Sequence, residues 1–245
     1  MARLHMTLGD KGGIGKSFIA VLLAQYFLDN KTNANLICLD IDPKNHTFSR
    51  YTELDVERID VQNDGDIEKM RFDLFVNRVL EADEDAEIIV DVGGNVYIPL
   101  MDYLRVNDVL QMLSETGVEI ILHVPIVGAG DLFPTLKTLD ELVASTPDVA
   151  RVSVWINQKN GRVEYNGKSF EESERYEDYK SRIRSITYIP LWRSDMQVSV
   201  AAMLEEAVTF NATMGMLTFD IMGKQRIKIA QRYLYQAIER SRVCQ

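Results

Sequence analysis

The chain has 245 residues, of which 46% are hydrophobic and 26% charged, and its formal net charge is −10. This composition is typical of a globular protein with a sizeable core, and the negative charge excludes general attraction to nucleic-acid phosphates. The two cysteines lie far apart, no signal peptide is evident, and the longest apolar run (residues 18–28) is too short to span a bilayer, so we expect a soluble cytoplasmic protein.

Short apolar runs alternate along the chain with longer amphipathic segments, a pattern typical of a mostly parallel sheet. In chain order, the expected strands are 3–8, 35–41, 87–92, 118–124, 151–156 and 185–189. The expected helices are 16–29, 67–81, 98–115, 131–145, 171–183, 196–208 and 218–241. The pattern predicts an α/β fold in which a doubly wound, mostly parallel sheet carries helices on both faces. No Pro/Gly-rich linker interrupts it, so we expect one domain over residues 1–245.

Three segments depart from simple alternation. Residues 45–66 are polar and acidic and predict a long connection after the second strand. Residues 158–170 contain two Asn-Gly pairs, which favour tight turns and predict a small β-hairpin insertion. Residues 221–245 are basic, so nucleic-acid or membrane contact stays open there. Their apolar residues, however, recur at helical spacing, which predicts that this C-terminal helix packs on the sheet.

The segment GDKGGIGKS, residues 9–17, lies between a predicted strand and a predicted helix, as a phosphate-binding loop requires. Gly12, Gly13 and Gly15 allow backbone N–H groups to point at phosphate oxygens, helped by the helix N-terminus. Lys16 is expected to reach the β- and γ-phosphates, and the Ser17 hydroxyl to bind Mg²⁺. The flanking strand and helix disfavour the alternative, a chance glycine-rich match.

The loop has two unusual residues. Asp10 stands where the standard P-loop pattern has glycine. Lys11 is a second lysine, and KGGIGKS matches the deviant Walker A pattern K-G-G-x-x-K-[ST]; the alternative for Lys11 is a solvated loop charge. The expected nucleotide-binding residues are Lys11, Gly12, Gly13, Ile14, Gly15, Lys16, Ser17 and Phe18.

Acidic residues end two of the predicted strands, at the edge where a parallel sheet opens to its ligand. Asp42 is expected to orient or activate a water, whereas Asp40 supports the loop or the metal shell. Asp91 is expected to hold Mg²⁺ through water, and the backbone of Gly93 and Gly94 to sense the γ-phosphate. The alternative for a single strand-terminal Asp is a turn former, but the three elements in this order point jointly to a nucleotide site.

The fifth predicted strand ends at Asn157, whose amide is expected to bond a base edge; the alternative is a plain turn residue. Guanine recognition usually needs a carboxylate, and residues 157–160 contain none. We therefore expect ATP over GTP. The three histidines are scattered, and no Cys/His spacing or Gly-x-Ser-x-Gly motif indicates zinc or serine chemistry.

At KGGIGKS, LDIDP (residues 39–43), IIVDVGG (residues 88–94) and Asn157, the sequence resembles the ParA/MinD family of deviant Walker A ATPases. The resemblance implies an ATP-sandwich homodimer in which Lys11 of one subunit reaches the phosphates bound by the other. It further implies that Lys16 and Ser17 bind nucleotide and Mg²⁺, that Asp42 positions the attacking water and that Asn157 reads adenine. The catalytic set is therefore Lys11, Lys16 and Asp42, and the metal set is Ser17, Asp40 and Asp91.

Within that family, residues 3–20, 164–172 and 218–230 resemble a branch encoded in plasmid conjugal transfer operons. This implies a slow ATPase switch that recruits other conjugal transfer or partition proteins. Two alternatives remain: a metabolic synthetase of the biotin-pathway type, which shares this loop, and a module that binds nucleotide without hydrolysing it. The first needs charged substrate ligands beside the γ-phosphate, for which no clear cluster is seen. The second is disfavoured by Asp42.

Overall fold

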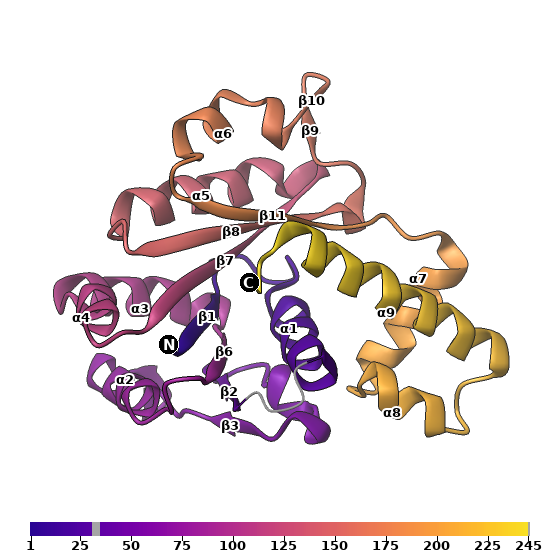
Figure 1. Cartoon of the computed structure of the whole chain (residues 1–245), viewed down its shortest axis with the longest axis horizontal. Coiled ribbons are helices and arrows are strands. Elements are labelled where there is room, and N and C mark those ends of the chain that lie inside the picture. Colours follow the sequence, from indigo (N-terminus) through magenta and orange to yellow (C-terminus); the bar gives the residue numbers. More distant parts are fainter. Residues whose placement is uncertain (31–34, 245) are drawn as a thin grey trace.

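A parallel sheet forms the centre of the fold in the computed structural model, which describes residues 1–30 and 35–244 (Figure 1). Within those ranges seven strands pair in the order β11-β8-β7-β1-β6-β2-β3, and every pair is parallel. The strands are β1 (Arg3–Thr7), β2 (Leu36–Asp40), β3 (Val56–Arg58), β6 (Glu87–Asp91), β7 (Glu119–Val127), β8 (Ala150–Asn157) and β11 (Ile183–Ile189). All six strands expected from the sequence are confirmed.

Helices cover both faces of the sheet, as predicted. Side chains alternate between the two faces along each strand, so Ile88 and Val90 belong to one hydrophobic cluster and Ile89 to the other. The first cluster includes α2 (Phe72–Leu80), α3 (Gly94–Val106), α4 (Val109–Glu115) and α5 (Leu132–Ser145). The second includes α1 (Lys16–Asn30), α7 (Ser194–Glu205), α8 (Phe210–Gly215) and α9 (Ile221–Ser241). The doubly wound α/β fold is therefore confirmed.

The edge strand β3 lies inside residues 45–66, for which only a connection was predicted. Its residues Glu57 and Arg58 are exposed, so the strand lacks the apolar pattern of its buried neighbours. The same segment contains a short antiparallel pair, β4 (Gln62–Asn63) and β5 (Asp66–Ile67). Backbone pairing at a solvent-facing edge does not require apolar side chains. The strand therefore could not be predicted from an apolar pattern in the sequence.

Several helix bounds differ from the predictions. The continuous helix expected over 98–115 is wrong, because α3 and α4 are separate and Asp108 between them has a left-handed φ of 48°. The helix expected over 171–183 is reduced to α6 (Glu174–Tyr179), since residue 183 already belongs to β11. The short α8 was not expected. The first two of these differences fall where a polar segment turns between two elements.

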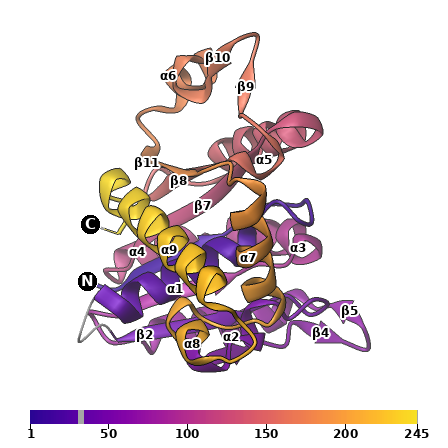
Figure 2. The same ribbon diagram turned by 90° about the vertical axis from the view of Figure 1, so that its right-hand side faces the viewer.

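The predicted hairpin is present as β9 (Glu164–Tyr165) and β10 (Lys168–Ser169). Asn166 and Gly167 both have positive φ, 52° and 75°, as a two-residue hairpin turn of type I′ requires. The earlier pair, Asn160-Gly161, does not form a second hairpin turn but ends the 3-10 helix η5 (Gln158–Asn160). Figures 1 and 2 show the hairpin together with α6 above α5, away from the sheet.

The C-terminal helix α9 packs against one face of the sheet, as expected. Ile227, Leu234 and Ile238 are buried in the same cluster as α1, and the two helices lie next to each other in Figure 2. The basic residues of α9 therefore belong to a helix whose apolar side is already covered. Over residues 1–30 and 35–244, no helix is long and apolar enough to cross a membrane.

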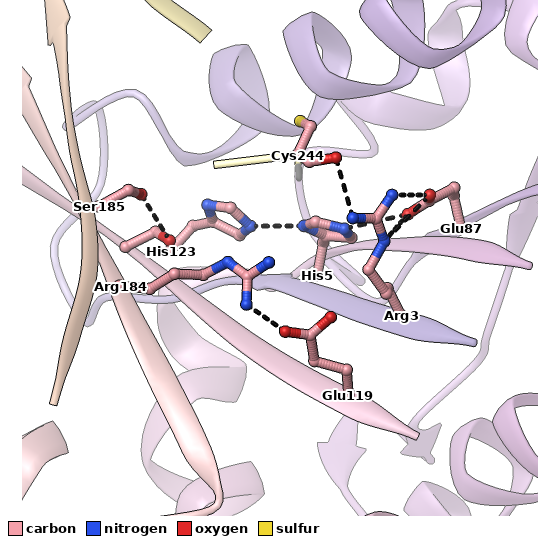
Figure 3. A network of polar contacts seen from close by, with 9 residues as sticks. Arg3, His5, Glu87, Glu119, His123, Arg184, Ser185 and Cys244 are labelled. Atoms are coloured by element: carbon pink, nitrogen blue, oxygen red, sulfur yellow. Dashed lines mark hydrogen bonds and ion pairs between the residues drawn. The ribbon is translucent and has the colours of Figure 1, made fainter. Parts of the chain in front are cut away.

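A buried chain of polar side chains crosses the sheet from Trp155 of β8 to Glu87 of β6, and Figure 3 shows its part from His123 to Glu87. The Trp155 indole N–H donates to Nδ1 of His123 (2.9 Å), so His123 must donate from Nε2 to Nδ1 of His5 (2.9 Å). His5 in turn donates from Nε2 to Glu87 (3.3 Å), which also pairs with Arg3. The indole can only donate, so it fixes both tautomers and requires both imidazoles to be neutral.

This arrangement predicts that acid destabilises the fold. Burial lowers the pKa of both His5 and His123. The unfolded chain binds a proton at each imidazole below about pH 6.5, whereas the folded protein binds none. The free energy of unfolding should therefore fall by as much as about 1.4 kcal/mol per pH unit for each histidine below that pH. Urea unfolding between pH 8 and pH 5.5 measures this slope.

The matched variants are His5→Gln and His123→Gln, each of which should remove part of the slope. Protonation of Asp91 has the opposite effect on the free energy of unfolding. Burial raises the pKa of Asp91 to about 6, so below that pH the folded state binds a proton that the unfolded state does not yet bind. An Asp91→Asn background separates the two effects. A slope that stays unchanged in both histidine variants would show that other groups cause it.

Candidate functional site

The loop of residues 9–17 joins the end of β1 to the start of α1 at the carboxyl edge of the sheet. Ile14 is buried beneath it, and the Asn157 amide at the end of β8 donates to the Ile14 carbonyl (3.0 Å). Gly15 has a φ of 106°, and a Cβ there would lie 2.7 Å from the Asn157 amide nitrogen. Glycine is therefore required at this position both for its backbone conformation and for the close approach of Asn157.

Lys16 is folded into the loop. Its side chain is buried and its ammonium donates to the carbonyl of Lys11 (2.9 Å). Burial lowers the pKa of Lys16, and the nearby carboxylates of Asp91, Asp42 and Asp10 act in the opposite direction. The loop thus places one cation at the start of α1, among the carboxylates that follow β1, β2 and β6.

Asp40 and Asp42 lie at the end of β2 but differ in their partners. The two oxygens of Asp40 accept backbone N–H bonds from Asp42 (3.0 Å) and Ser49 (2.9 Å), so Asp40 holds the following loop together. Asp42 accepts from the backbone of Lys44 and Asn45 and from the Asn45 amide (2.9–3.2 Å). Of the two roles expected for Asp40, the structure displays loop support; a role in the metal shell stays a prediction.

Asp91 lies at the end of β6. One of its carboxylate oxygens accepts a hydrogen bond from a described residue and the other does not. Oδ1 accepts from the Thr7 hydroxyl (2.9 Å), whereas Oδ2 is buried and has no hydrogen-bond donor within the described part of the chain. Burial raises the pKa of Asp91 to about 6, while the neighbouring Ser17 hydroxyl lowers it. A buried oxygen without a donor is costly unless a ligand satisfies it.

These donors fit Mg²⁺. The Ser17 hydroxyl and the open oxygen of Asp91 are hard oxygen ligands of the kind that Mg²⁺ prefers. No group of three or more His, Cys, Asp or Glu side chains that could hold a metal occurs in residues 1–30 and 35–244.

Gly93 and Gly94 allow three loops to meet. A Cβ on Gly93 would lie 2.7 Å from Cγ of Asp42, and one on Gly94 would lie 2.7 Å from the carbonyl oxygen of Asp10. The segment after β6 is thus packed directly against both the β2 loop and the phosphate-loop segment. Any side chain at these positions would separate the loops, so the contact explains why two glycines follow Asp91.

Lys11 has a partner in its own chain. Its ammonium pairs with Asp131, in the 3-10 helix η4 (Ala129–Asp131) that precedes α5, and Asp131 also accepts from the Asn160 amide (3.2 Å). This pairing lowers the pKa of Asp131. The Lys159 ammonium donates to the carbonyl of Gly13. Lys11 thus forms an ion pair within its own chain at a partly exposed position, and its expected role across a dimer stays a prediction.

Sequence analysis did not single out Asp131, Lys159 or Thr7. One signal could have found the first two: in a parallel sheet, residues after β7 and β8 reach the same edge as those after β1. Asn157, by contrast, was singled out as a base contact. Its amide is buried and bonds Ile14, and its oxygen accepts from the Lys159 N–H (3.2 Å). A contact with adenine stays a prediction.

Two curated relatives resemble the whole chain. They are TraL proteins of Escherichia coli, 34% and 33% identical over 244 residues, which is 99% of this chain and 100% of each relative. The chain belongs to the TraL family. This confirms the closer resemblance of residues 3–20, 164–172 and 218–230 and extends it to nearly the full length. No protein-family model matches the sequence.

A solved structure supports the fold independently. The cell division protein MinD of Aquifex aeolicus superposes with a TM-score of 0.52 at 12% identity, covering 96% of this chain and 97% of that one. At this level of identity the match concerns the fold alone. The TraL family member described here therefore has the ParA/MinD-type P-loop fold that the sequence motifs predict.

Proposed function

We propose that this TraL family protein is a Mg²⁺-dependent ATPase that dimerises on ATP and serves as a switch in plasmid conjugal transfer. The main support is Lys16, buried inside a phosphate-type loop at the N-terminus of α1 and close to Asp42 and Asp91. The three carboxylates near Lys16 offset only part of the cost of burying its ammonium group. A polyanionic ligand bound at the loop would offset the rest. The open Asp91 oxygen beside Ser17 favours a divalent cation next to that ligand.

In this proposal the backbone N–H groups of residues 12–17 and the N-terminus of α1 hold the phosphates, and Lys16 leaves the Lys11 carbonyl to contact them. Ser17 and Asp91 hold Mg²⁺, which neutralises phosphate charge when bound. Asp40 keeps the loop after β2 in place through its two backbone hydrogen bonds.

Asp42 is the residue proposed to position the attacking water. It is packed on Gly93, and its carboxylate is fixed by hydrogen bonds from Lys44 and Asn45. Oδ1 accepts both backbone N–H groups, whereas Oδ2 accepts one hydrogen bond, from the Asn45 amide, so a lone pair of Oδ2 is left for a water to donate to. Fixing the acceptor before the reaction reduces the reorganisation that water activation costs.

Asp42→Ala should therefore lower the rate of ATP hydrolysis by at least ~100-fold and change ATP affinity by about twofold or less. The loss of rate arises because water is no longer oriented, while the loop and Lys16 still hold the phosphates. Phosphate release at saturating ATP measures the rate, and calorimetry measures the affinity. If phosphate release is undiminished, a residue other than Asp42 positions the attacking water, and Asp40 would be tested first.

ATP should bind more tightly than GTP. Residues 157–160, beside the loop, include the amides of Asn157 and Asn160 but no carboxylate to pair with guanine N1 and N2. Competition binding with Mg²⁺ present compares ATP, ADP and GTP, and it also tests the proposed function. Failure of all three to bind would reject the nucleotide site; preference for GTP would reject the adenine assignment alone.

The proposed dimer rests on Lys11 and the family resemblance. The Lys11 carbonyl contacts Lys16 (2.9 Å), but the Lys11 side chain is directed to Asp131, where it is partly exposed. We propose that ATP-dependent closure moves Lys11 from Asp131 to the phosphates bound by the partner subunit. Other conjugal transfer or partition proteins are the proposed partners of the ATP-bound dimer.

One observation favours an alternative, the metabolic synthetase. A cavity of about 340 Å³ adjoins Asp42 and contains His46 and Arg58, which hydrogen bond to each other (2.8 Å). Arg58 could bind a carboxylate substrate, but Asp40, Asp42 and Asp60 also line the cavity and oppose a second anion there. A synthetase would release phosphate only with its second substrate, whereas the switch hydrolyses ATP with Mg²⁺ alone. Phosphate release from purified protein separates the two.

A further inference from the structure

A groove of about 600 Å³ lies between α5 and the insertion that contains β9, β10 and α6. Figure 2 shows these elements above α5, on the far side of the sheet from α9. Its buried floor is apolar and consists of Leu132, Leu136, Val163 and Phe170. The groove is separate from the residues of the proposed nucleotide site, and its size is that of a ligand or peptide cleft.

Two aromatic side chains stand exposed at the groove. Phe133 of α5 is 62% exposed and Tyr165 of β9 is 55% exposed, and their ring centroids are 5.2 Å apart at 77°. An edge-on pair of this kind joins the two walls while leaving most of both rings in water. Adjacent exposed aromatics beside an apolar floor are typical of a recognition surface, because a partner gains energy by covering them.

The groove is also negatively charged. Arg175 is committed to Asp140 through two hydrogen bonds (2.6 and 3.0 Å). The carboxylates of Glu164, Glu174 and Asp178 line the groove and are exposed, and none of the three forms an ion pair with another residue of the described chain. Lys168 is the one further cation in the lining. The field at the groove thus repels nucleic acid and anionic lipid and attracts cations.

We propose that this groove binds a basic segment of a partner protein that carries an aromatic or long aliphatic side chain. The apolar side chain would pack against the exposed surfaces of Phe133 and Tyr165 and reach the floor beside them, and Lys or Arg on either side would meet Glu174 and Asp178. The net charge of −10 opposes general attraction of a second copy to an acidic groove, and the basic residues of α9 belong to a helix that is already packed on its own chain.

The groove is connected to the loop that holds Lys11. One wall, α5, begins directly after Asp131, and the other follows Lys159 and Asn160, which contact Gly13 and Asp131. A bound segment that moves either wall would therefore change the contact between Lys11 and Asp131. This coupling rests on the proposed function, whereas the docking itself does not.

The test selects 12-residue random peptides, displayed on phage, against the full-length protein without nucleotide. We expect the enriched peptides to combine Lys or Arg with an aromatic residue, and to bind in fluorescence anisotropy. The double variant Phe133→Ser/Tyr165→Ser and the charge variant Glu174→Lys/Asp178→Lys should each weaken binding at least ~10-fold. Val198→Ser, on α7 and 70% exposed, is the matched control and should bind as wild type does.

The positions changed are exposed, so the variants should keep the wild-type circular dichroism spectrum. The proposal fails if selection on wild type enriches nothing beyond selection on Phe133→Ser/Tyr165→Ser, or if the enriched peptides are acidic. Self-association that the double variant abolishes would assign the groove to a second copy and also overturn it. Peptide binding with no ATP binding would reject only the nucleotide switch, so the two proposals are tested separately.

Discussion

Lys16→Ala should weaken ATP binding by at least ~100-fold, which corresponds to about 2.7 kcal/mol. Lys16 is buried in the loop, and its present acceptor is only the Lys11 carbonyl. Replacing it with alanine removes the one side-chain cation that the loop encloses, so the phosphates lose a charge-assisted contact in a site shielded from solvent. Calorimetry with Mg²⁺ and ATP measures the affinity of both proteins.

The matched control is Lys137→Ala on α5. Lys137 is exposed and pairs only with Glu141 one helical turn away, so its loss should leave ATP affinity within about twofold of wild type. Equal affinities for wild type and Lys16→Ala would remove the phosphate-loop assignment. An equal loss in the two lysine variants would instead show that the effect is one of overall charge.

Lys11→Ala should retain ATP binding at one site but lose the ATP-dependent dimer and at least ~90% of turnover. In the proposed dimer, Lys11 contacts phosphates held by the partner subunit, where burial strengthens the contact. Sedimentation velocity with an unhydrolysed ATP analogue measures the dimer, and phosphate release measures turnover. A Lys11→Ala protein that dimerises as well as wild type would contradict this role.

Asp131→Asn provides the complementary variant. It removes the charge that holds Lys11 in its own subunit while keeping a side chain of similar size. If Lys11 must leave Asp131 to reach the partner, this variant should dimerise at lower protein concentration than wild type. A dimer weakened by Asp131→Asn would mean that Asp131 supports the active position of Lys11.

The parts of the site that lie close together in sequence could be predicted. The loop of residues 9–17 carries its own glycine spacing, and the acids at Asp42 and Asp91 follow buried apolar strands whose carboxyl ends must share one edge. The same apolar runs predict the sheet, because a strand buried on both faces needs no polar alternation.

Contacts between distant segments could not be predicted. Lys11 and Asp131 are 120 residues apart and Lys159 and Gly13 are 146 apart, and nothing in the local sequence of Asp131 or Lys159 shows that they contact the loop. The amide of Asn157 illustrates a second limit. It can bond a base or a backbone carbonyl equally well, and only the fold places it against Ile14.

Light scattering on the wild-type protein measures whether ATP causes it to dimerise. The sample is measured with Mg²⁺ alone, with ADP and with an unhydrolysed ATP analogue. ADP lacks the γ-phosphate charge that the proposed interface requires, so the account predicts a monomer of about 28 kDa in the first two cases and about twice that mass with the analogue. A mass that is the same in all three conditions would contradict the nucleotide switch.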